Sequence, residues 1–213
     1  MNEPLVWQPQ LEAIGIVCDP FWAHSDPFEG DFYHEYIATH PDFSLAVRQT
    51  VASMLVTAQE KVPSNWQIVL RAGYRPLSVQ QAIFDSFCAE TARLHPEWSG
   101  QQIHTYAQTY VSDPTSTSPH YTGGAVDIDV RNIDSDTYID FGTPINTASS
   151  KSHLDTNEIT AEQQSNREVL HSTMLSVGFA PLASEWWHFQ YGERVWTDYY
   201  GHDSPMYDII REI

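Results

Sequence analysis

The sequence contains few basic residues. Ten Lys and Arg residues stand against 28 Asp and Glu residues in a chain of 213, giving a formal net charge of −18. Nucleic-acid binding depends on clustered Lys and Arg that neutralise phosphates, so this composition argues against a nucleic-acid partner. The same charge argues against adhesion to an anionic membrane. We expect neither partner, and the excess acid helps to keep the protein in solution.

Cysteines and long apolar runs are also scarce. Cys18 and Cys88 are the only cysteines, too few for a disulfide framework in a chain of this length, and their positions leave open whether they pair. The sequence has no apolar run of about 18 residues, so no membrane span is expected. The opening "MNEPLVWQPQLEAIGIVCDP" lacks the basic start and apolar core of a signal peptide. These absences predict a cytoplasmic protein.

The remaining composition is that of a globular protein, with 41% hydrophobic and 13% aromatic residues. The length suits one good-sized domain, and no repeat or low-complexity linker divides the chain. We therefore predict a single domain over residues 1–213. Its first part, 1–40, is rich in Pro, aromatic and acidic residues without periodicity and is expected to be an irregular arm, while 42–200 forms the core.

Hydrophobic periodicity and capping residues indicate the secondary structure. Helices are predicted at 42–62, 78–93, 99–110 and 160–177, the last three opened by capping boxes at Ser78, Ser99 and Thr160. Strands are predicted at 66–70, in the alternating "GAVDIDV" at 124–130, and in the aromatic "EWWHFQYG" at 185–192. The polar stretch 131–160 is expected to be a surface loop or a lid. This uneven mixture favours a single α+β domain, with helices flanking a mainly antiparallel sheet, over a doubly wound parallel fold.

Several familiar motifs are incomplete. "HEYIATH" at 34–40 has Ala38 where the HExxH zinc helix needs its second histidine, and "DIDVRN" at 127–132 lacks the glycine of a calcium loop. What remains is His120 before one strand, Asp127 within it, and His188 in another strand. A catalytic zinc takes three protein ligands of these types and leaves one position open for water. Two imidazoles and one carboxylate leave the ion with a net charge near +1, which suits it to acidify that water.

Glu185 precedes His188 by three residues, and in a flat strand the two would point to opposite faces. If both serve one site, Glu185 must lie in a turn or at a bulge. A carboxylate placed there could accept the proton of the water without binding the metal. Each of these residues alone is readily explained by packing, but the set together is much harder to explain in that way.

These residues carry a resemblance. "SPHYTGGAVD" at 118–127 fits the SxHxxGxAxD signature, and "EWWH" at 185–188 the ExWH signature, of zinc D,D-peptidases that cleave peptidoglycan peptides. With "GYRP" at 73–76 and "FGTP" at 141–144, the chain most resembles the D-alanyl-D-alanine dipeptidases of the vancomycin-resistance type. The resemblance covers roughly residues 66 to 200 and implies a zinc metallopeptidase with one Zn²⁺ per chain and a small dipeptide substrate. It implies no oligomeric state.

The resemblance also implies a role for each matching residue. His120, Asp127 and His188 would bind zinc, and Glu185 would be the general base. Arg75 would stabilise the oxyanion.

Two further positions concern substrate binding. Ser118 would help to hold the terminal carboxylate of the substrate. At the position where the dipeptidases carry an acid that pairs with the free ammonium of the dipeptide, this chain has Asn146, whose amide can accept a hydrogen bond but brings no charge. Asp140 or Asp155 could replace that acid.

Three functions therefore remain. The first is hydrolysis of D-alanyl-D-alanine. The second is a D,D- or L,D-carboxypeptidase that acts on longer peptidoglycan peptides. The third is a binding module with a zinc ion that is not catalytic, which would have no need of Glu185.

Overall fold

The computed structural model describes residues 3–23, 36–109, 111–115, 118–147 and 149–211. Its main sheet has six strands in the order β2-β4-β5-β8-β7, with β6 paired to β5. The strands are β2 (Val17–Cys18), β4 (Trp66–Ala72), β5 (Ala125–Asn132), β6 (Thr137–Tyr138), β7 (Ala180–Leu182) and β8 (Glu185–Gln190). β2 runs parallel to β4, and the other pairings are antiparallel. The predicted α+β fold with a mainly antiparallel sheet is confirmed.

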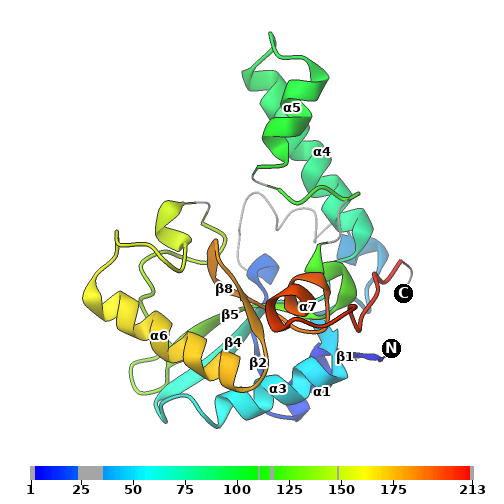
Figure 1. The fold of residues 1–213 in the computed structure, drawn as a ribbon. Helices are drawn as coiled ribbons and strands as arrows, with labels where there is room; N and C mark the ends of the chain where they lie inside the picture. Colours follow the sequence, from blue (N-terminus) through cyan, green and yellow to red (C-terminus); the bar gives the residue numbers. More distant parts are fainter. Residues whose placement is uncertain (1–2, 24–35, 110, 116–117, 148, 212–213) are drawn as a thin grey trace.

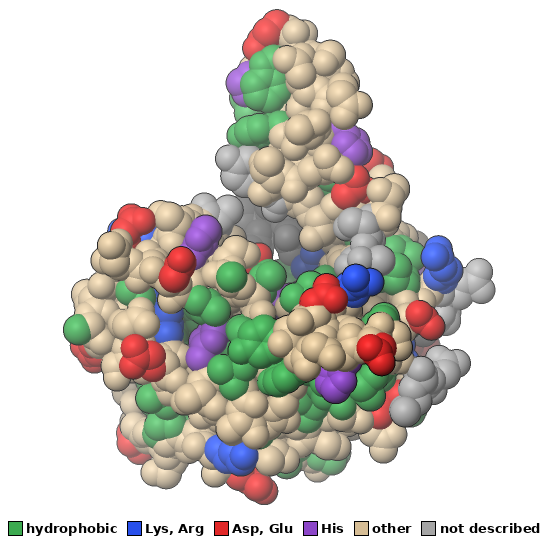
Figure 2. Space-filling view, viewed as in Figure 1, with side chains coloured by type: hydrophobic (Ala, Val, Ile, Leu, Met, Phe, Trp, Pro, Cys, Tyr) green, Lys and Arg blue, Asp and Glu red, His purple; other side chains and the backbone are tan. Residues whose placement is uncertain are grey.

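Helices lie beside the sheet and at one end of it (Figure 1). They are α1 (Gln8–Ala13), α3 (Gln49–Gln59), α4 (Leu77–Leu94), α5 (Gly100–Ala107), α6 (Ala161–Ser176) and α7 (Arg194–Tyr200). α4 and α5 form a hairpin that projects from the body. Ile83 and Phe84 in the first half of α4 are buried. Farther from the body, ring contacts of Tyr106 with Phe87 and Trp98 hold the two helices of the hairpin together. Acidic side chains are scattered over the visible surface and basic ones are few, in keeping with the net charge (Figure 2).

The alternation in β5 separates the core from the site. Val126, Ile128 and Val130 are fully buried and belong to the main hydrophobic cluster. Their neighbours in β4 are in register, with Leu70 opposite Ile128 and Ile68 opposite Val130. Each such side chain contributes about 1.5–3 kcal/mol by leaving water, so this face anchors β4 and β5 firmly. The other face of β5 is left to carry polar groups.

Most of the predicted elements are present, with shifts at their ends. The capping boxes at Ser99 and Thr160 are confirmed. The one at Ser78 is wrong, because α4 begins a residue earlier and its N-cap is Pro76, in extended backbone that leads directly into the helix. The helix expected from residue 42 begins only at Gln49. The segment before it forms strand β3 (Ala46–Arg48), because backbone pairing with β1 (Leu5–Trp7) decides its conformation.

The segment 1–40 is less irregular than predicted. In its described part it contributes β1 and α1, the edge strand β2 and the 3-10 turn η1 (Phe21–Ala23). The stretch 131–160 is mainly irregular, with β6 and the 3-10 turn η3 (Ser150–Ser152), and is fastened to α6 by Arg167. This buried guanidinium donates to the carbonyls of Phe141, Lys151 and His153. The predicted surface loop is thus clamped in place.

Two further expectations concern cysteines and membrane spans. Cys18 and Cys88 are both free thiols. Burial raises the pKa of Cys18 to about 12, so this thiol stays protonated. Among the described helices there is none with the length and apolar character needed to cross a bilayer.

Candidate metal centre

Two strands bring Asp127 and His188 together. The residues are direct partners in the antiparallel pairing of β5 with β8, although they are far apart in the sequence. Side chains at directly opposed positions point to the same face and lie close to each other. His188 Nδ1 is accordingly 2.9 Å from Asp127 Oδ1.

His120 reaches the same point from a tight turn. It lies in the 3-10 turn η2 (Pro119–Thr122), which ends at Gly123 in the left-handed region with φ 72. Its Nε2 is 3.4 Å from Asp127 Oδ2. Only glycine fits at position 124, because a Cβ there would lie 2.4 Å from the carbonyl oxygen of Tyr191. The two glycines therefore let the chain turn from His120 into β5 without a steric clash.

The geometry of His120, Asp127 and His188 fits a metal ion. One ligand atom of each residue lies within 4.8 Å of the others, and all three side chains are at most 8% exposed. Ligand atoms of a tetrahedral zinc, with bonds of 2.0–2.2 Å, are about 3.3 Å apart, so only small movements would close this set around an ion. The donor set of two imidazoles and one carboxylate leaves a fourth position for water.

Further contacts fix the orientation of both imidazoles. His120 Nδ1 is 2.8 Å from the carbonyl oxygen of Gly73, which can only accept, so Nδ1 carries the proton and Nε2 is left with a lone pair. His188 Nε2 lies 3.3 Å from Gln190 Oε1, while the amide nitrogen of Gln190 faces the carbonyl of Pro181. These contacts turn His120 Nε2 and His188 Nδ1 toward Asp127, as partners of metal-binding histidines commonly do.

The charges at the centre are strongly coupled. Burial alone would raise the pKa of Asp127, but the neighbouring His120 and His188 outweigh it and hold that pKa far below its usual range. Burial alone would lower the pKa of His188, but its hydrogen bond and charge interaction with Asp127 raise it. The carboxylate is therefore ionised and favours positive charge beside it, a role that a divalent cation can fill.

Glu185 lies beside the centre through a bulge. Leu182 pairs with Glu185 but Pro181 pairs with Phe189, so the register of β7 against β8 shifts between these two pairs. The bulge brings Glu185 Oε2 to 3.9 Å from His188 Nδ1, as the spacing of three predicted. Its side chain is 38% exposed, far more than the three candidate ligands. Burial raises the pKa of Glu185, as does Asp127, while His188, His120 and Arg75 lower it.

Arg75 is tied to the same assembly by its main chain. Its backbone N–H donates to the carbonyl of His120 at 3.1 Å, and its charge acts on Glu185. Ser118 is buried immediately before η2, and its hydroxyl does not cap that turn. The structure thus joins the backbone of Arg75 to that of His120, and Ser118 is the N-cap of the turn that carries His120.

Asn146 lies in a turn of the loop between β6 and η3. It is exposed and in left-handed backbone with φ 59. Asp140, considered as a replacement acid, is engaged elsewhere, because its carboxylate accepts from Gly142 N and Gln163 Nε2 at 2.8 Å each. Asp155 lies in the same clamped loop, between η3 and α6.

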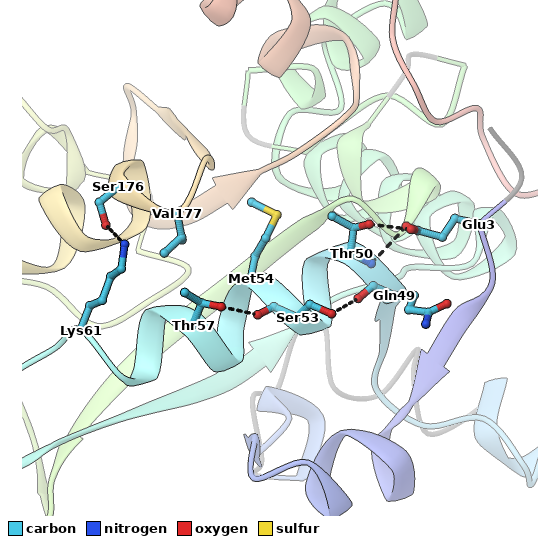
Figure 3. A pocket seen from close by; sticks show the side chains of 9 residues that line it. All are labelled: Glu3, Gln49, Thr50, Ser53, Met54, Thr57, Lys61, Ser176 and Val177. Atoms are coloured by element: carbon cyan, nitrogen blue, oxygen red, sulfur yellow. Dashed lines mark hydrogen bonds between the residues drawn. The ribbon is translucent and has the colours of Figure 1, made fainter.

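Sequence reasoning missed the residues that support the centre. Gln190 had a readable signal, because it follows His188 by two in a strand and must point to the same face. Gly73 and Gln80 had none, since their contacts depend on how β4 and α4 lie against the turn at 118–123. A groove along α3 is separate from the centre and is lined mainly by polar side chains, among which Lys61 donates to Ser176 and Thr50 donates to Glu3 (Figure 3).

Comparison with known proteins now identifies the family. The peptidase M15 family, described as D-ala-D-ala dipeptidase, matches residues 37–205. The chain belongs to this family. A D-alanyl-D-alanine dipeptidase of Synechocystis sp. is 31% identical over 171 residues, which cover 70% of this chain and 69% of the relative. One from Streptomyces coelicolor is 27% identical over 202 residues, covering 90% and 93%.

Two solved structures of other proteins show a more distant similarity. A variant of the vancomycin-resistance D,D-pentapeptidase VanY in complex with Zn(II) is 20% identical, covers 78% of this chain and 84% of its own, and superposes with a TM-score of 0.41. VanYB in complex with D-alanine-D-alanine is 19% identical, covers 76% and 81%, and has a TM-score of 0.42.

Proposed function

We propose that the protein is a zinc-dependent dipeptidase that hydrolyses D-alanyl-D-alanine, with one zinc per chain. The observation that carries the proposal is the buried cluster of His120, Asp127 and His188, with Glu185 beside it on the more exposed side. Membership of the family, and relatives that are named D-alanyl-D-alanine dipeptidases over most of their length, support the choice of substrate.

Zinc bound by His120, Asp127 and His188 would supply Lewis acidity, lowering the pKa of a water and polarising the scissile carbonyl. The protein's own part in the reaction begins with Glu185. Its carboxylate accepts a proton from the attacking water and then delivers it to the nitrogen of the leaving D-alanine. The raised pKa of Glu185 suits the first of these transfers, because a carboxylate with a pKa nearer neutrality is a stronger base and accepts the proton of the water more readily.

Arg75 has the charge needed for the developing oxyanion. The charge of its guanidinium lowers the pKa of Glu185, which supports a position on the reacting side of the centre. A cation held in advance where negative charge develops stabilises the transition state more than the ground state. Ser118, at the start of the turn that carries His120, is the candidate for holding the terminal carboxylate of the substrate.

The principal alternative is a carboxypeptidase that trims longer peptides. Asn146 lacks the charge that would pair with a free ammonium, and for this reason a carboxypeptidase is the second candidate. Comparison of D-Ala-D-Ala with its N-acetylated form separates the two, because only a dipeptidase needs the free amine. We expect the free dipeptide to be cleaved much faster. Equal rates on both substrates would favour the carboxypeptidase.

The proposal is tested by assaying D-Ala-D-Ala hydrolysis before and after zinc is removed with a chelator. Activity should disappear with the metal and return when one equivalent of Zn²⁺ is added back. L-Ala-L-Ala serves as the control substrate. A protein that binds one zinc but releases no D-alanine would be a zinc-containing binding module, and hydrolysis that survives complete removal of metal would exclude the mechanism.

A further inference from the structure

A buried glutamine contacts Arg75 from the neighbouring helix. Gln80 lies in the first part of α4 and is 1% exposed. Its Oε1 accepts a hydrogen bond from Arg75 Nη1 at 2.7 Å, and its Nε2 donates to the carbonyl of Ser112 at 2.8 Å. Both ends of one amide are thus matched to groups from two different segments of the chain.

The chemistry of the two partners sets the direction of this amide. The carbonyl of Ser112 can only accept, so it requires the nitrogen of Gln80, and the guanidinium of Arg75 can only donate, so it requires the oxygen. A turned amide would place donor against donor and acceptor against acceptor. Because the side chain is buried, neither mismatch could be relieved by water. Gln80 is therefore held in one orientation and presents a fixed acceptor to Arg75.

The backbone of Arg75 is anchored separately. Its N–H donates to the carbonyl of His120, and the carbonyl of Gly73 faces the ring of the same histidine. These contacts place the start of the arginine side chain at the metal centre but leave its rotatable bonds undetermined. The hydrogen bond that the guanidinium donates to Gln80 restricts this remaining freedom.

We propose that Gln80 is a positioning residue that aims the guanidinium of Arg75 at the reacting carbonyl without itself neutralising the charge. A carboxylate at this position would hold the arginine more strongly, but it would also neutralise it. A neutral amide orients the cation without competing with the oxyanion for its charge. The inference rests on the proposed function, because it assigns Arg75 to the oxyanion.

Two variants of Gln80 and one control test the proposal. Gln80→Met keeps the volume and removes both hydrogen bonds. It should lower kcat by about ten- to a hundredfold, less than complete loss of an oxyanion donor, with little change in KM or zinc content. Gln80→Glu keeps the acceptor and adds charge, so its kcat should also fall. Gln81→Met is the matched control, since the neighbouring Gln81 is exposed and donates along α4 to Asp85.

A double-mutant cycle separates positioning from a general structural effect. In an Arg75→Ala background, Gln80→Met should cost less than about twofold in kcat, because the group that it orients is gone. Equal costs in both backgrounds, or a loss of zinc with the loss of kcat, would overturn the positioning role. Full activity of Gln80→Glu would overturn the need for a neutral partner.

A crystal structure of Gln80→Met gives a readout that does not depend on activity. We expect the guanidinium of Arg75 to leave its wild-type direction while the metal ligands stay in place. An unmoved arginine would refute the inference even in a fully active dipeptidase. A wild-type protein that fails to cleave D-Ala-D-Ala would instead refute the proposed function, and the direction of Arg75 in this variant would still decide whether Gln80 orients it.

Discussion

Asp129 is expected to destabilise the protein at neutral pH. It lies on the same face of β5 as Asp127, where its Oδ1 accepts from the N–H of Val130 at 2.8 Å. Burial, reinforced by the charge of Asp19, raises its pKa from 3.8 to about 6, against the lowering effects of the Val130 amide and Arg71. Arg71 offsets the cost of ionising Asp129 only in part, because its guanidinium is already paired with Asp19. At pH 7 the folded protein therefore contains a poorly compensated, half-buried carboxylate.

The sign and size of the effect follow from linkage. The folded state binds the Asp129 proton more tightly than the unfolded state, so the free energy of unfolding falls as the pH rises from about 4 to about 6 and is constant above. At about 1.4 kcal/mol per pH unit, the difference between 3.8 and about 6 sets an upper limit of about 3 kcal/mol. Since the group keeps some contact with solvent, we expect about 1–2 kcal/mol.

Asp129→Asn should remove this cost. Its amide oxygen can still accept from Val130, so the free energy of unfolding at pH 7 should rise by about 1–2 kcal/mol, or roughly 2–8 °C in Tm for a chain of this size. The assay is thermal unfolding of the zinc-loaded protein between about pH 4 and pH 8. Asp203→Asn, at an exposed position, controls for removing one negative charge from a highly acidic protein. A gain that does not grow with pH, or a loss of stability at pH 7, would refute the reasoning.

Three further predictions concern the metal centre. Glu185→Gln should keep its zinc, measured by elemental analysis, while kcat for D-Ala-D-Ala falls by about 10²- to 10⁴-fold; unchanged hydrolysis would remove Glu185 from the mechanism. Gly124→Ala should lower stability by about 1–3 kcal/mol and weaken zinc binding, because its Cβ would meet the Tyr191 carbonyl at 2.4 Å; a Tm and zinc affinity equal to the wild type would contradict this. Arg48→Met should lower the free energy of unfolding by about 2–4 kcal/mol and weaken zinc binding, because the buried guanidinium of Arg48 donates to the carbonyls of Thr122 at 2.6 Å and of Glu3. A loss of stability with unchanged zinc affinity would show that Arg48 does not support the turn that carries His120.

Local signals in the sequence predicted the elements well where the deciding interactions are local. The capping boxes at Ser99 and Thr160 join residues three apart, and the alternation of Val126 with Asp127 reflects the geometry of one strand. The predictions of secondary structure failed where a partner distant in the sequence determines the backbone conformation. Val47 fits the helical pattern of residues 47–62, but it lies in a strand because it pairs with Val6.

The same division holds at the metal centre. The sequence alone predicted the types of the candidate ligands, the glycines that permit the turn after His120, and the need for a turn or bulge at Glu185, because these depend on side-chain chemistry and short spacings. Only the tertiary structure decided that Asp127 and His188 are opposed across β5 and β8, and that Gln80 of α4 meets Arg75. Such contacts depend on strand register and helix placement, which arise from packing of the whole chain and leave no periodic trace in the residues concerned.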